Sequence, residues 1–141
     1  MKAPTAVKWA GGIGCVALMI FVGPGLLLGG LLIAGSQRTI SQRTTSPDGW
    51  HEARVQFDDG GAISGFERLV FVKHSWNLSD EPLLSCRPFW GHGQAKIRLI
   101  WANSTTLIIE HHIAPTNVAA SLPNCGPIKI VPRPTLPFEN F

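Results

Sequence analysis

The sequence predicts a mainly β protein, in which one N-terminal transmembrane helix precedes a small antiparallel β-meander domain that curls into a sandwich or half-barrel. Three observations predict it. No charged residue occurs in residues 9–36. Beyond that stretch, apolar and polar residues alternate with a period of two, which is typical of half-buried strands. Clusters of Gly, Pro, Asp and Asn separate the alternating segments, as turns do.

The uncharged stretch is long enough to cross a bilayer. Its 28 residues, 9–36, make about 42 Å of straight helix, whereas a bilayer core of about 30 Å needs about 20 apolar residues. A cleaved signal peptide has a shorter apolar region, and a lipoprotein signal needs its cysteine at the end of that region, not at Cys15. We therefore expect residues 1–36 to be an uncleaved signal-anchor, with Lys2 and Lys8 in the cytoplasm.

Small residues inside this segment are spaced as in closely packed membrane helices. Gly25 and Gly29 form a G-x-x-x-G pair, and Gly30 with Ala34 repeats the small-xxx-small spacing. Such spacing lets two helix backbones approach each other. Glycine is also frequent in membrane helices generally, so the alternative is that these residues serve no packing face.

Charge is divided unevenly along the chain. The net charge is +3, but residues 1–43 hold four basic residues and no acidic one. Residues 44–141 carry eight Lys or Arg and nine Asp or Glu, a balance of −1. A nucleic-acid-binding domain needs cations clustered on its folded surface. We therefore exclude nucleic acid as a partner and expect the lipid bilayer and a protein in the membrane or envelope.

The segment after the anchor is predicted to be a short tether, 37–46, followed by the β domain, 47–131, and a Pro-rich extended tail, 132–141. The domain is expected to contain five strands, of which the last is confined to an edge or a sheet end by its flanking prolines. The expected strands are residues 51–57, 66–73, 95–101, 106–112 and 128–131.

Alternation within the first of these strands predicts which side chains are buried. Ala53, Val55 and Phe57 alternate with Glu52, Arg54 and Gln56. Because successive side chains point to opposite faces of a strand, we expect the apolar set in the core and the polar set in water.

Cys86 and Cys125 are predicted to form a disulfide. Both lie in segments without periodicity in a small β domain, a pattern typical of a single staple. A disulfide requires an oxidising compartment, which places the domain on the periplasmic or extracytoplasmic side of the inner membrane. The alternative is two unrelated free thiols.

No catalytic, cofactor or metal motif occurs in the sequence, and we expect no enzymatic activity and no cofactor. Zinc sites have recognisable spacings of His and Cys, and the five histidines do not show them. The adjacent His111 and His112 would point to opposite faces of a strand. Trp76, Phe89 and Trp90 are the candidates for a ligand or partner surface, since aromatic side chains dominate such surfaces.

Two stretches carry a resemblance to known proteins. Ser46-Pro47-Asp48-Gly49 precedes an alternating strand and then Asp59-Gly60-Gly61-Ala62, and Trp101-Ala102-Asn103-Ser104-Thr105-Thr106-Leu107-Ile108-Ile109 follows later. Together, over residues 46–112, they resemble a group of small bacterial membrane-anchored or lipoprotein-like domains of unknown function. Each half is also similar to strand motifs of TolB-type propeller blades, although the chain has too few strands for a propeller. The resemblance implies a bacterial envelope location and supplies no active-site residues.

These observations favour an envelope structural or accessory interaction module on a single-pass membrane protein. The alternative is a ligand-binding sensor domain at the membrane surface, which the aromatic residues between positions 76 and 90 favour.

Overall fold

The computed structural model describes residues 20, 22–28, 37–61 and 65–139, and the chain divides into two compact units, 1–36 and 37–141. In the first unit, residues 22–28 are helical. Within the described part of the chain, no helix has both the length and the apolar character needed to cross a membrane. Of the four small residues predicted to pack, Gly25 is described and has open space at its Cβ position. Gly29, Gly30 and Ala34 lie outside the described residues, as does most of the predicted anchor.

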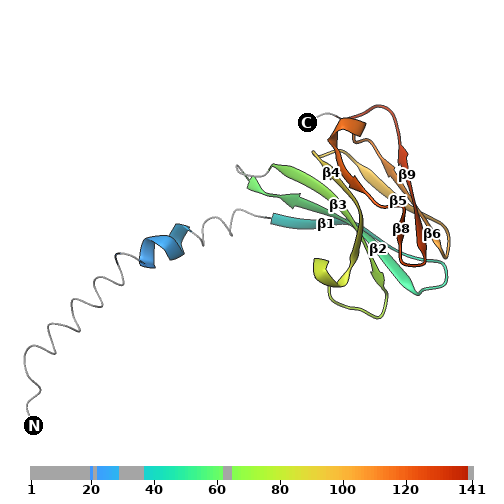
Figure 1. Cartoon of the computed structure of the whole chain (residues 1–141), viewed down its shortest axis with the longest axis horizontal. Coiled ribbons are helices and arrows are strands. Elements are labelled where there is room, and N and C mark those ends of the chain that lie inside the picture. Colours follow the sequence, from blue (N-terminus) through green and yellow to red (C-terminus); the bar gives the residue numbers. More distant parts are fainter. Residues whose placement is uncertain (1–19, 21, 29–36, 62–64, 140–141) are drawn as a thin grey trace, which may run out of the picture. The chain divides into compact units, whose positions relative to one another are not determined.

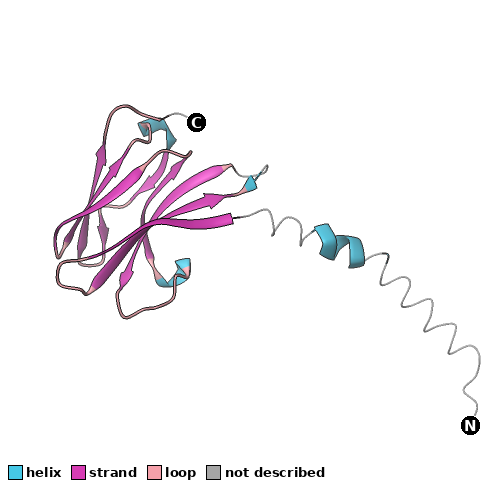
Figure 2. Cartoon of the chain, turned by 180° about the vertical axis from the view of Figure 1, so that it is seen from behind, coloured by secondary structure: helices cyan, strands magenta, loops and turns pink. Residues whose placement is uncertain are grey.

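The second unit is a β-sandwich of two sheets (Figure 1). The first sheet has the strand order β1-β2-β3-β4-β7, and the second has the order β5-β6-β9-β8. Two short 3-10 helices, η1 and η2, interrupt the connections, and Figure 2 shows them in cyan against the magenta strands. The elements in the described residues are β1 (Gln37–Thr45), β2 (His51–Asp59), β3 (Phe66–His74), η1 (Pro82–Leu84), β4 (Cys86–His92), β5 (Ile97–Asn103), β6 (Thr106–His111), η2 (Pro115–Asn117), β7 (Val118–Ser121), β8 (Asn124–Cys125) and β9 (Ile128–Pro134).

The core lies between the two sheets and consists of side chains from their inner faces. The first sheet contributes the alternate positions of β2, β3 and β4, and the second contributes those of β5, β6 and β9, as the period of two requires. All of these side chains are almost completely removed from water. The core residues are Ala53, Val55, Val70, Val72, Phe89, Ala95, Leu99, Leu107, Ile109, Ile113, Cys125, Ile128 and Ile130.

The five strands predicted from the sequence all form, as β2, β3, β5, β6 and β9. The prediction of a purely antiparallel five-stranded meander is wrong, because β9 pairs with β6 in parallel, from Thr106–Lys129 to His111–Pro134. After β6 the chain crosses to the first sheet, adds β7 beside β4, and then returns through β8 to β9. β8 pairs only with the first residues of β9, so the proline-containing half of β9 has a free edge, as its prolines require.

The segment predicted to be a tether is an integral strand. β1 pairs antiparallel with β2 from Gln37–Asp59 to Thr45–Glu52. It lacks an apolar alternation because it is the edge strand of its sheet, and most of its residues are exposed.

The predicted tail also begins inside the fold. β9 continues to Pro134, and beyond it the Thr135 amide donates a hydrogen bond of 2.8 Å to the carbonyl of His111. The compact unit therefore spans residues 37–141, not 47–131.

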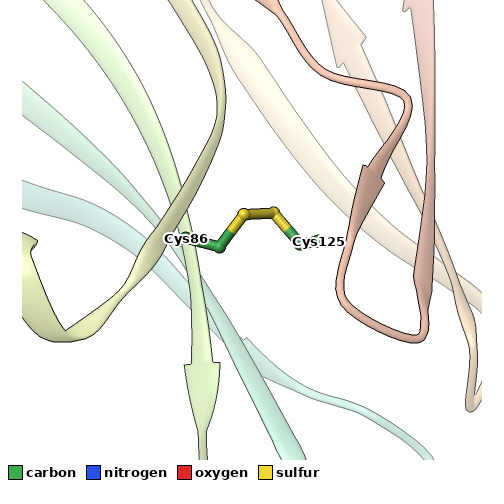
Figure 3. Close-up of a disulfide and its surroundings, with 2 residues drawn as sticks. All are labelled: Cys86 and Cys125. Carbon is green, nitrogen blue, oxygen red and sulfur yellow. A yellow bond between two sulfur atoms is a disulfide. The ribbon is translucent and has the colours of Figure 1, made fainter.

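Two contacts close the sandwich at its sides. On one side, the side-chain amide of Gln42 makes the two hydrogen bonds that a neighbouring strand would make. Its Nε2 donates to the Leu99 carbonyl at 3.3 Å, and its Oε1 accepts from the Leu99 backbone N–H at 3.1 Å. These bonds join the edge strands β1 and β5. On the other side, the Cys86–Cys125 disulfide joins β4 to β8, with Cα atoms 5.8 Å apart (Figure 3). The predicted disulfide is thus confirmed, and its 39-residue separation corresponds to about 4 kcal/mol of loop-closure entropy.

The predicted burial of the first strand is correct for two residues and wrong for three. Ala53 and Val55 are in the core, but Phe57, which was also expected there, is only half-buried and stacks on Phe66 at 5.6 Å. Arg54 and Gln56, which were expected in water, are 1% and 5% exposed. The outer face of β2 is therefore covered although no second sheet lies over it.

Burial of Arg54 predicts a large mutational effect at a residue that alternation assigned to water. Arg54→Ala removes a charged hydrogen bond and leaves a carbonyl without its donor, so we expect a loss of about 2–3 kcal/mol of stability. Arg98→Ala is the matched control, since Arg98 is 69% exposed and pairs with Glu110 at the surface; it is expected to cost under about 1 kcal/mol. Urea unfolding of the full chain in detergent measures both, and equal costs would show that Arg54 is not a buried structural cation.

Candidate functional site

The outer face of the first sheet is covered by the β3–β4 loop, which one carboxylate holds in place. Asp80, in that loop, accepts hydrogen bonds from Arg43 on β1 at 3.1 and 2.7 Å. Lys73 on β3 donates to the same carboxylate at 3.0 Å, and Arg54 on β2 donates to the Asp80 carbonyl at 2.7 Å. Three strands are thereby tied to one loop residue.

The cations of this network are placed by strand pairing. Arg43 lies opposite Arg54, and Glu52 lies opposite Lys73, on the outer face. Arg54 also sits 4.6 Å above the Phe71 ring, which gives its buried guanidinium a cation–π partner. Arg43 donates to the Asp80 carboxylate and, with the ammonium of Lys73, holds the pKa of Asp80 well below its usual range. Asp80 is therefore ionised in the folded chain at every physiological pH.

The loop held by Asp80 carries large apolar side chains in solvent. Trp76 is 74% exposed, and Leu78 and Leu83 are 92% and 95% exposed. Trp50, in the β1–β2 turn, lies beside Trp76: the Ser75 amide donates to the Trp50 carbonyl at 2.9 Å, and Trp50 and Trp76 line one shallow hollow of about 270 Å³. We call Trp50, Trp76, Leu78, Leu83 and Leu84 the loop-end surface.

The loop-end surface borders the open end of the sandwich. A second hollow, of about 200 Å³, is lined there by His51, His74 and Leu84 together with the disulfide. His51 and His74 are paired across β2 and β3, and their ring centroids are 4.9 Å apart. His74 in turn stacks on Trp76 at 5.7 Å. Burial, and then the neighbouring His74, lower the pKa of His51.

Of the three aromatic residues predicted to form a ligand or partner surface, the structure leaves one fully in solvent. Trp76 is exposed on the loop-end surface, but Phe89 is 0% exposed and belongs to the core. Trp90 is half-buried on β4, where Arg87 lies 4.9 Å from its ring. The error arose because β4 was not recognised as a strand: Phe89 and Trp90 are consecutive, so they point to opposite faces.

The adjacent histidines point to opposite faces, as predicted, but only one of them is at a wet surface. His111 is 3% exposed, lies 4.7 Å from the Phe89 ring, and its Nδ1 is 3.2 Å from the Ile113 carbonyl. His112 is partly exposed, with its Nδ1 3.0 Å from the Pro137 carbonyl. Burial lowers the pKa of His111. Each of the two histidines has a backbone carbonyl as its partner.

The residues of the loop-end surface that sequence reasoning missed had weak signals. Trp50 follows the turn Ser46-Pro47-Asp48-Gly49 and precedes the first predicted strand, a position where a large apolar side chain has no core to enter. Leu78, Leu83 and Leu84 lie in a segment without any periodicity, which is where apolar residues are least explained by core packing.

The exposed side chains of the loop-end surface can make apolar contacts with a partner. In the described part of the chain, no three His, Cys, Asp or Glu side chains gather closely enough to hold a metal ion. No family model, no curated protein and no solved structure matches the chain.

The Asp80 network makes the stability of the fold depend on pH in the acidic range. A carboxyl group whose pKa is lower in the folded chain than its unfolded value of about 3.9 contributes stability above that value and loses it as the pH falls toward the folded pKa. We expect Asp80→Asn to lower the melting temperature most near pH 6, and the difference from the wild type to shrink toward pH 3. Glu81→Gln, at the next position, makes the matched control and should show no such pH dependence.

Thermal unfolding at both pH values measures this effect. If the two variants changed with pH in the same way, Asp80 would not be the anchoring carboxylate of the loop.

Proposed function

We propose that this protein is a non-catalytic interaction module of the bacterial envelope, in which the loop-end surface docks onto a protein partner. The observation that carries the proposal is the exposure of Trp50, Trp76, Leu78, Leu83 and Leu84 on neighbouring loops. Clustered apolar surface bordered by polar residues is typical of interaction sites, and tryptophan is enriched among the residues that dominate binding energy.

Preorganisation supports docking at this surface. The loop is tied to β1, β2 and β3 through Asp80, so its exposed side chains are presented from a fixed backbone. A partner then binds without having to order the loop, which reduces the entropic cost of association.

Negative charge beside the loop-end surface favours a partner with basic side chains. Asp48 lines the hollow between the two tryptophans, and Glu81 lies between Leu78 and Leu83 in the chain. Both carboxylates are exposed. We infer that the partner presents an apolar groove with basic side chains at its rim, since complementary rim charges steer association.

The loop-end surface lies at the end of the first sheet opposite to Gln37 (Figure 1). β1 has nine residues, so the two ends of that strand are about 30 Å apart. The loop-end surface is therefore separate from the edge of the domain at which β1 begins.

For location, we propose a single-pass protein of the inner membrane with residues 1–36 as its signal-anchor and the β domain on the periplasmic side. The uncharged run 9–36 supports a membrane span. The Cys86–Cys125 disulfide supports an oxidising compartment for the domain.

Reporter fusions after Phe141 test this topology. An enzyme that folds only where disulfides form should be active when fused there, and an enzyme active only in the cytoplasm should be inactive. The opposite pair of results would place the domain in the cytoplasm and contradict the proposed location.

Photocrosslinking in intact cells tests the docking proposal. A benzophenone amino acid at position 76 or 83 should give an adduct of one defined mass, because both side chains lie on the docking surface. Leu136 is the matched control: it is 74% exposed but follows β9, which ends at Pro134 opposite His111 and away from the β8–β9 turn beside the disulfide. The same label at position 136 should not give that adduct.

Glu81→Lys should weaken the adduct formed from position 83, because it reverses one charge of the rim without removing apolar surface. Identical adducts from all three positions, or adducts only with lipid or with a second copy of the chain, would overturn the proposed partner.

A further inference from the structure

The open end of the sandwich contains two imidazoles that face each other across neighbouring strands. His51 begins β2 and His74 ends β3, and the two residues are direct partners in the antiparallel register. Opposed residues of such a pair project from the same face with Cβ atoms about 5 Å apart. Their ring centroids are 4.9 Å apart with the planes inclined by 36°.

The His51 ring lacks any hydrogen-bond partner among the described residues. Both of its nitrogens, Nδ1 and Nε2, are buried and neither makes a hydrogen bond. A buried imidazole nitrogen without a partner is unfavourable, and such groups commonly indicate a bound water or ion. The 200 Å³ hollow beside His51 and His74 offers room for one.

We propose that His51 and His74 together bind one divalent transition-metal ion of the kind that imidazole prefers, with Zn²⁺ as the reference case. Imidazole nitrogen suits Zn²⁺, Cu²⁺ and Ni²⁺ better than it suits Mg²⁺ or Ca²⁺. The proposal does not rest on the docking function, because it concerns the mouth of the sandwich and not the loop tips.

The distance between the two rings fits shared coordination. A Zn–N bond of about 2.0–2.1 Å and a tetrahedral angle place the centroids of two ligating imidazoles about 5 Å apart. The observed separation is 4.9 Å, which matches that expected for two imidazoles on one ion.

The groups around the pair act on positive charge in both directions. Burial and the neighbouring His74 oppose a charge on His51, whereas the Asp48 carboxylate, in the turn before β2, favours it. Lys73 also lines the hollow, but its ammonium is 3.0 Å from Asp80 and 3.5 Å from Glu52, so its charge is already paired. The sulfurs of Cys86 and Cys125 are bonded to each other and are not available as thiolate ligands.

Two protein ligands define an open site. The remaining coordination positions of the ion would be taken by water or by a group from outside the chain, and the ion would exchange readily. His74 is the exposed member of the pair and is therefore the side from which the ion enters.

Titration of the full chain in detergent with zinc chloride alone tests the proposal. We expect one zinc ion per chain by calorimetry, and a rise in melting temperature on adding zinc, because the ion binds the folded state selectively. His74→Gln should weaken binding by more than about tenfold while leaving the zinc-free melting temperature unchanged, since its side chain is exposed. His92→Gln is the matched control, because His92 is also an exposed histidine at a strand end and should bind zinc as the wild type does.

A second variant tests the other proposed ligand. His51→Gln should also abolish binding, and near-UV circular dichroism establishes that this variant is folded before it is titrated. Zinc binding that persists in His74→Gln, that is lost equally in His92→Gln, or that is absent from the folded wild type would overturn the site.

Discussion

The outer face of the first sheet depends on a single ion-pair network centred on Asp80. Without it, β1, β2 and β3 would expose Arg54, Lys73 and the edge of Phe71 to water, and the β3–β4 loop would have no fixed position. A buried guanidinium and a buried ammonium are costly unless they are paired and hydrogen-bonded. Here both cations reach the same loop residue, at 2.7 Å from Arg54 and 3.0 Å from Lys73. Their burial therefore orders the loop, and the loop keeps them buried.

This network also explains why alternation alone mispredicted β2. A period of two correctly gave Ala53 and Val55 to the core, because the inner face needs apolar side chains. It carries no information about what covers the other face. Arg54 was assigned to water because the residue that buries it, Asp80, lies 26 positions away in a segment without periodicity. Local sequence predicts strand faces where one side is solvated, and it fails where a loop folds back over that side.

Apolar content separates the strands that were predicted from the sequence from those that were missed. β2, β3, β5, β6 and β9 each contain enough apolar residues to be identified. β1 is polar because it is an edge strand, and β4 was concealed by Pro88 and Gly91. Gly91 is small for a reason that only the fold reveals: a Cβ there would lie 2.7 Å from the Ile113 side chain. The parallel pairing of β6 with β9 was equally invisible, since it depends on the excursion of β7 into the other sheet.

At the candidate site, the sequence indicated some of the residues that matter, but not which of them lie next to one another in the fold. Trp76 was identified, and the disulfide pair was identified because two cysteines in a small domain leave few alternatives. The opposition of His51 and His74 could be inferred only from the register of β2 and β3, since the two lie 23 positions apart without any metal-binding motif.

Closure of the sandwich determines where recognition can occur. Gln42 seals the seam between β1 and β5 by occupying the Leu99 backbone groups, which removes part of an exposed strand edge that could otherwise pair with another chain. The disulfide seals the opposite seam between β4 and β8. The two sheets are thus joined at two sides of the sandwich. The histidine pair lies at the end to which the Asp80 network attaches the loop. The fold thereby concentrates its exposed Trp50 and Trp76, the unpartnered His51 imidazole and the loop held by Asp80 at one end, which is the arrangement expected of a recognition surface built on a rigid scaffold.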